Sequence, residues 1–253
     1  MLRSYLERGL AAGAAGGLAF GLFVAFVGNP LVGYVERLGG HDHAAQAGGH
    51  HGGEGLSTAV THLVSVGGGV LWGLLLGAVA FGVVYYVLEP AIPGTGATKR
   101  YVLAAAGFVT VSGAPWLVLP PQPAGVEAAL PTVTRLLWYG GMVAAGAAVC
   151  LFAGYAYNRL MARGAGRPTA ALAALAPFAL LAVPVAVAPA TAAAGDTPAG
   201  MVAAYRGFVV FGQATLWFVL ASAHAWLDTP SPPPGAVDRS VEETVGADRQ
   251  GSS

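Results

Sequence analysis

The chain has 253 residues, of which 12 are Lys or Arg and 12 are Asp or Glu, so that only 9% are charged and the formal net charge is zero. Soluble globular domains carry about 25% charged residues, whereas 55% of this chain is apolar. This composition excludes a disordered chain, a nucleic-acid-binding protein with a basic surface and an ordinary soluble enzyme.

Six segments of the chain contain no charged residue at all, and together they make up more than half of it: residues 9–28, 63–88, 101–119, 136–158, 168–195 and 207–227. Each is long enough for an α-helix to cross about 30 Å of hydrocarbon. A helix also satisfies its own backbone polar groups where no water is available. We therefore predict an all-α fold, a polytopic transmembrane bundle of six helices in the cell membrane.

The first two segments carry glycine at every fourth position. Positions four apart share a helix face, so each row forms a groove that admits another backbone closely, as in a glycine zipper. The rows are Gly9, Gly13, Gly17 and Gly21 in the first segment and Gly69, Gly73 and Gly77 in the second. We expect tight packing here, against either a helix of this chain or another subunit.

The loop between these two segments is rich in histidine, the commonest side-chain ligand for borderline divalent metals. The candidate ligands are His41, His43, His50 and His51, with His62 at the outer mouth of the second helix and Asp42 and Glu54 as oxygen donors. The intervening glycines favour weak, exchanging capture, because binding must order a flexible segment. We expect Co²⁺ or Ni²⁺, with Zn²⁺ and Cu²⁺ as competitors; the alternative is a polar loop without a metal.

The fifth segment is interrupted by Pro177, Pro184 and Pro189. Each proline removes a backbone donor, so we expect this helix to be kinked, broken or re-entrant, and a count of five helices is the alternative. In the sixth segment His224 lies four residues before Asp228, so the two side chains share a face and can pair. They mark the inner end of an ion path that starts at His62, unless they are interfacial residues that reach the headgroups.

Basic residues are unevenly distributed between the loops. If the N-terminus is cytoplasmic, the inner segments hold seven of them and the outer loops three, which favours cytoplasmic N- and C-termini. We divide the chain into a transmembrane domain over residues 1–228, which carries an external His-rich loop at 38–61, and a disordered acidic cytoplasmic tail over 229–253.

Catalytic motifs are missing from the sequence. It contains no GxxxxGK[ST] and no HExxH, which argues against a P-loop nucleotidase and a zinc protease. We expect a protein that is not an enzyme and holds no resident cofactor.

Several stretches resemble a known family. They are Asn29-Pro30-Leu31, the turn Leu119-Pro120-Pro121 with Pro123, the pair Arg135 and Trp138, residues 177–184, and Trp217 in the last helix. In these the sequence resembles the CbtA family, proposed cobalt transporters that accompany a small His-bearing subunit, CbtB. The family is usually counted at five spans, and it often has histidines where this chain has Ser112 and Val185.

The resemblance implies cobalt uptake that supplies corrinoid synthesis. We expect an integral membrane subunit of a divalent metal transporter, with capture at the loop, transfer past His62 and release near His224 and Asp228. Its expected partners are the lipid bilayer, a CbtB-type subunit and further copies of itself, but not nucleic acid. The alternative is a non-transporting partner or metal-sensing module beside a separate permease, which a solid apolar core would favour.

Overall fold

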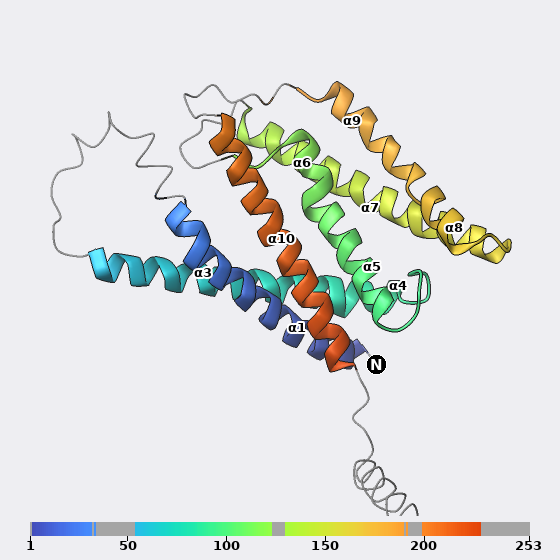
Figure 1. Cartoon of the computed structure of the whole chain (residues 1–253), viewed down its shortest axis with the longest axis horizontal. Helices are drawn as coiled ribbons and strands as arrows, with labels where there is room; N and C mark the ends of the chain where they lie inside the picture. The colour runs from blue at the N-terminus through green and yellow to red at the C-terminus, as the bar shows by residue number, and fades with distance from the viewer. Residues whose placement is uncertain are drawn as a thin grey trace, which may run out of the picture.

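The computed structural model describes residues 2–31, 33, 54–122, 130–189, 191 and 199–228. All regular elements in these ranges are helices, and Figure 1 shows them as one bundle. Six helical spans are long and apolar enough to cross a membrane: Leu2–Leu31, Ala59–Leu88, Ala97–Val118, Thr132–Ala162, Arg167–Val187 and Gly200–Leu227. The prediction of an all-α bundle with six spans is confirmed within the described part of the chain.

The first three spans each contain a π-helical stretch, in which the backbone is wound more widely than in an α-helix. Span 1 is α1 (Leu2–Phe23) followed by η1 (Val24–Gly28). Span 2 is α3 (Glu54–Leu76), η2 (Gly77–Val84) and α4 (Tyr85–Leu88). Span 3 is α5 (Ala97–Phe108), η3 (Val109–Gly113) and α6 (Ala114–Val118). Long π stretches are rare and often lie at functional sites.

The last three spans differ in regularity. Span 4 is the uninterrupted α7 (Thr132–Ala162), and span 6 is α10 (Ala199–Leu227). Span 5 is broken as expected: α8 (Arg167–Ala173) leads into the 3₁₀-helix η4 (Ala176–Leu181) and α9 (Ala182–Val187). Pro177 lies at the start of η4, where a missing backbone donor costs least.

The spans form two packed groups. In the first, α1 contacts α3 and α10, and α10 contacts α5; in the second, α7 contacts η3, α6, α8 and η4. Each group has its own apolar core, one around Phe81 and Leu216 and the other around Met142 and Leu181. Span 3 belongs to both groups, since its first half packs on α10 and its second half on α7 (Figure 1).

The glycine rows of spans 1 and 2 face each other. A Cβ atom on Gly13 would overlap the carbonyl oxygen of Gly73, and one on Gly77 would overlap the carbonyl oxygen of Gly9. Side chains are therefore excluded from this contact, and the two backbones touch. The partner of each row is a helix of the same chain.

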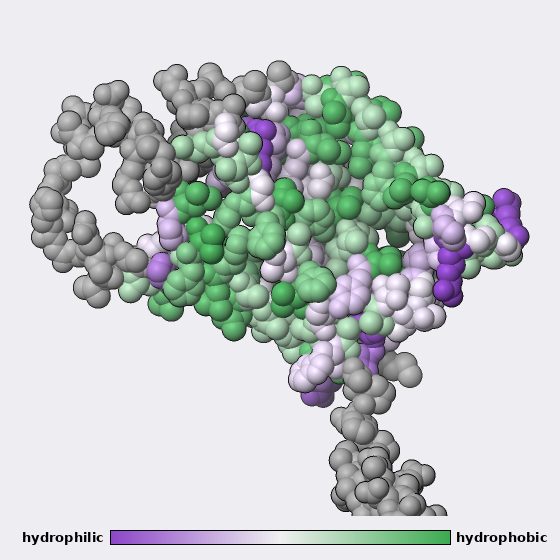
Figure 2. All heavy atoms as spheres, viewed as in Figure 1, coloured by the Kyte–Doolittle hydropathy of each residue, from purple (hydrophilic) through white to green (hydrophobic). Residues whose placement is uncertain are grey.

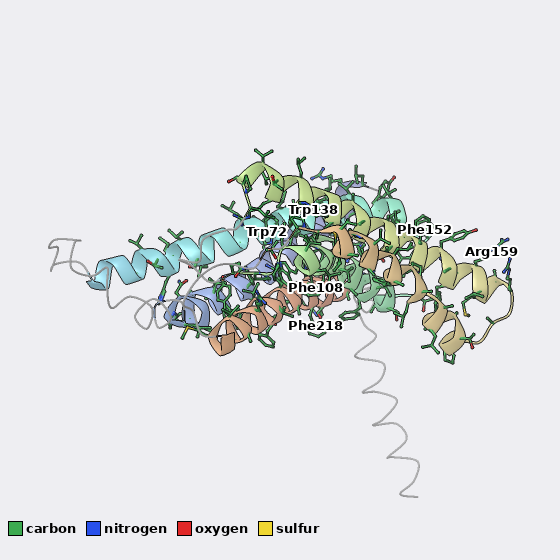
Figure 3. The ribbon with its side chains drawn as sticks, turned by 90° about the horizontal axis from the view of Figure 1, so that it is seen from above. Trp72, Phe108, Trp138, Phe152, Arg159 and Phe218 are labelled. Carbon is green, nitrogen blue, oxygen red and sulfur yellow. The ribbon has the colours of Figure 1, made fainter. Side chains whose placement is uncertain are left out.

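The outer surface is that of a protein in lipid. Leu63 and Leu137 are 73% and 72% exposed, and Figure 2 shows a largely hydrophobic surface with the hydrophilic residues gathered mainly near the ends of the bundle. Figure 3 shows one of them, Arg159, projecting from the far end of α7. Such a surface is stable in hydrocarbon and not in water.

Candidate functional site at the terminal face

Polar side chains gather at two opposite ends of the first group of spans. We call the end where α1 begins and α10 finishes the terminal face, and the end where η1 finishes and α3 begins the loop face (Figure 1). The terminal face carries the denser network.

Asp228, the residue that follows α10, is the centre of this network. One carboxylate oxygen accepts a charge-assisted hydrogen bond from Nη1 of Arg8 on α1, and the other from Nη2 of Arg100 on α5. Arg100 is only 6% exposed. Its positive charge lies inside the protein and is neutralised there by the Asp228 carboxylate. The two ion pairs thus link spans 1, 3 and 6 through the single carboxylate of Asp228.

His224 lies one turn before Asp228 and is 1% exposed. Its Nδ1 accepts a hydrogen bond of 3.2 Å from Nε of Arg100. Nδ1 therefore bears the lone pair of the neutral ring and Nε2 bears the proton. Within the described residues Nε2 has no hydrogen-bond partner, and the ring lies 5.1 Å from that of Phe81 and 5.4 Å from that of Tyr85.

Span 2 joins the network through Glu89, which follows α4. Its Oε2 accepts a 2.5 Å hydrogen bond from the hydroxyl of Tyr5 on α1, and its Oε1 a 3.4 Å bond from the hydroxyl of Tyr85. The Glu89 carbonyl oxygen accepts a 2.6 Å bond from Nζ of Lys99. The guanidinium carbon of Arg100 lies 5.6 Å from the Tyr85 ring centroid, a cation–π distance.

Local sequence explains how Arg100 reaches this position. The turn between α4 and α5 passes through Gly94 and Gly96, whose φ angles of +99° and +52° favour glycine. This turn starts α5 at Ala97, so that Arg100 lies on the first turn of a helix that packs against α10.

The loop face holds a smaller polar group. The His62 ring, on α3, lies 5.3 Å from the ring of Phe26, and Nδ2 of Asn29 donates a 2.9 Å hydrogen bond to Oγ of Ser65. The other predicted loop ligands, His41, Asp42, His43, His50 and His51, lie outside the described residues, as do the side chain of Glu54 and the tail 229–253. In the described ranges no three His, Cys, Asp or Glu side chains come together as a metal site.

A cavity of about 450 Å³ lies beside the proline-rich turn after span 3. Its walls are Trp116, Leu119, Pro120, Pro121, Gln122, Leu130, Thr132, Arg135, Leu136, Tyr139 and Thr191. The turn is fixed by Nε of Arg206, which donates a 3.2 Å hydrogen bond to the carbonyl of Pro121. The walls include neither His62 nor His224, so this cavity does not connect the two ends of the predicted ion path.

Sequence reasoning identified His224 and Asp228 and missed the residues between and around them. The structure brings the two together through Arg100, which bonds to both. In the sequence Arg8 and Arg100 count only among the basic residues that flank the apolar segments, and nothing there marks Tyr5 or Glu89 as part of a site. The one available signal was that Arg100 directly adjoins the charge-free segment 101–119.

Six apolar spans in one bundle, with the ion pairs of the described residues at its terminal face, define a multi-pass integral membrane protein. Residues 2–228 match the family described as "Probable cobalt transporter subunit (CbtA)", and the chain belongs to this family. The match includes all six spans and the terminal face, and it confirms the resemblance seen in the sequence. No curated protein and no solved structure matches the chain.

Proposed function

We propose that this chain is the membrane-spanning subunit of a cobalt uptake transporter and that the ion leaves the bundle at His224 and Asp228. One observation carries the proposal: a histidine that is 1% exposed lies one turn from a carboxylate, and the imidazole Nδ1 and the carboxylate both bond to Arg100. Buried polar groups in spans are costly and mark functional positions. An imidazole and a carboxylate also suit a borderline divalent ion.

The proposed route begins at the His-rich loop. His41, His43, His50 and His51 capture the cation, with Asp42 and Glu54 as oxygen donors, and His62 receives it at the loop face. The polar groups of the loop face support this step: His62 precedes Ser65 by three residues on α3, and Ser65 accepts a hydrogen bond from Asn29. Such groups replace water around an ion that enters apolar surroundings. With both termini cytoplasmic, the route leads into the cell.

Passage requires the helices to move. Spans 1 and 2 touch backbone to backbone between the two faces, and the core beside them is formed by Leu76, Phe81 and Leu216. We therefore assign this arrangement to a closed state of the transporter. Since the family is one of subunits, we propose a small His-bearing subunit of the CbtB type as the partner, alongside lipid and further copies of the chain.

The apolar core between His62 and His224 also favours a second function. In that case the chain does not conduct cobalt but assembles with a separate permease, as a structural partner or as a metal sensor. The two functions differ in whether this chain changes cobalt accumulation by itself or only with the permease.

Accumulation of radiolabelled Co²⁺ in cells with and without the chain tests the proposal. We expect accumulation to rise with the chain, and we expect replacement of the four loop histidines by alanine to raise the half-saturating Co²⁺ concentration without abolishing uptake. Gln46→Ala, in the same loop, is the matched control. Equal accumulation with and without the chain would overturn the transport proposal, and unchanged uptake at limiting Co²⁺ in the histidine variant would overturn the capture step.

A further inference from the structure

We propose that the Arg100 guanidinium occupies the place of the transported cation at the terminal face, so that Arg100 and a divalent ion exclude each other there. The inference rests on the proposed function in one respect, because it takes His224 and Asp228 as the last protein ligands of the ion.

Arg100 engages one atom of each proposed ligand of the ion. Its Nη2 bonds to Oδ2 of Asp228, and its Nε donates a 3.2 Å hydrogen bond to Nδ1 of His224. A carboxylate oxygen and an imidazole lone pair are the two ligand atoms with which these residues would bind Co²⁺. Both are taken by one side chain, and the remaining nitrogen, Nε2 of His224, carries a proton and cannot ligate in this tautomer.

Electrostatics supports the same conclusion. The second oxygen of Asp228 already accepts from Arg8, so two guanidinium groups share one carboxylate. Arginine stays protonated inside proteins. Lys99 adds a third positive charge nearby, and the carboxylate of Glu89 is engaged by Tyr5 and Tyr85. A divalent cation cannot enter this group of charges unless Arg100 withdraws.

This arrangement also explains how bound cobalt would be released. Arg100 is tethered beside the site at the start of α5, and a tethered competitor acts at a high effective concentration. When Arg100 returns to Asp228 and His224, it displaces the cation. The site therefore binds its ion transiently, as release requires, and does not trap it.

Cobalt binding to the purified full-length protein tests this. The four loop histidines are replaced by alanine so that they do not contribute, and bound Co²⁺ is measured by equilibrium dialysis and by its visible absorption. We expect Arg100→Gln to bind one Co²⁺ per chain at least about tenfold more tightly than the Arg100 protein, which corresponds to roughly 1.4 kcal/mol. Adding His224→Phe should remove the gain, and Arg3→Gln, in an exposed ion pair on α1, should not produce it.

Mg²⁺ serves as the second control, because this ion prefers oxygen ligands and gains little from imidazole. The proposal is overturned if Arg100→Gln binds Co²⁺ no more tightly than the Arg100 protein, or if the gain survives His224→Phe. If Arg100→Gln does not fold, Arg100→Met decides, since this unbranched side chain carries no charge and no donor for Asp228 or His224 and should also tighten binding. Binding is measured without transport, so a failed uptake assay and a failed binding assay overturn different proposals.

Discussion

Gly13 of α1 and Gly73 of α3 lie so close that a Cβ atom on either residue would overlap the backbone carbonyl oxygen of the other. This contact joins spans 1 and 2 with no side chain between them. It is a packing solution suited to lipid, where close backbone approach replaces hydrophobic collapse as the source of helix association.

Gly73→Ala should therefore lower the stability of the protein. Even one methyl group must force α1 and α3 apart, and overpacking of this kind costs about 1–3 kcal/mol. The measurement is thermal unfolding of the detergent-solubilised protein. Gly68→Ala is the matched control, because a Cβ at Gly68 meets nothing within 4 Å. Equal melting temperatures for the two variants would contradict the close contact.

Asp228→Asn should destabilise the terminal face. The amide cannot neutralise Arg100, which is 6% exposed, or Arg8. Removing one partner of a buried ion pair costs about 3–5 kcal/mol, and we expect the lower end of this range because the Asp228 side chain is 30% exposed. Chemical unfolding measures this loss of stability. Glu7→Gln, in the exposed Arg3 pair, should unfold like the unmodified protein.

Tyr5→Phe tests the link between spans 1 and 2. It removes the hydroxyl that donates a 2.5 Å hydrogen bond to the Glu89 carboxylate. A hydrogen bond to a charged group contributes about 1.5–3 kcal/mol to stability. Tyr86→Phe is the control, since Tyr86 is 42% exposed and also contacts the Tyr5 ring. The free energy of unfolding should fall for the first variant only. A similar loss in both variants would contradict a specific contribution from the Tyr5–Glu89 hydrogen bond.

The predicted orientation can be tested by labelling in a Cys150→Ala background, which removes the one native cysteine. With cytoplasmic termini, an impermeant maleimide should label Gln46→Cys in intact cells. It should label Thr95→Cys, in the turn at the terminal face, only after lysis. The reverse pattern would place the terminal face outside and reverse the proposed direction of transport.

The spans were predictable from the sequence because a charged residue is costly at nearly any position of a helix in hydrocarbon. Each span therefore appears as a segment without charge. The break in span 5 was also predictable, because Pro177 acts on its own backbone. The π stretches such as η2 (Gly77–Val84) were not, since nothing in a run of apolar residues distinguishes one helical winding from another.

The candidate site was predictable only where its residues are neighbours in sequence. His224 and Asp228 share a helix face by their spacing, whereas Arg8 and Asp228 are 220 positions apart and Arg100 and His224 are 124 apart. Which helices meet depends on the shapes of apolar faces that look alike in sequence. For this reason the sequence indicates only a basic flank at Arg100, whereas the structure buries its side chain.

The 3₁₀-helix in span 5 has a consequence for the fit to the bilayer. This span is the shortest of the six described, with 21 residues from Arg167 to Val187, and as an α-helix it would measure roughly 32 Å. A 3₁₀-helix rises about 0.5 Å more per residue than an α-helix. The six residues of η4 therefore lengthen the span by about 3 Å, which leaves it some room to tilt in hydrocarbon about 30 Å thick. The 3₁₀ segment thus gives the shortest described span a margin for tilt.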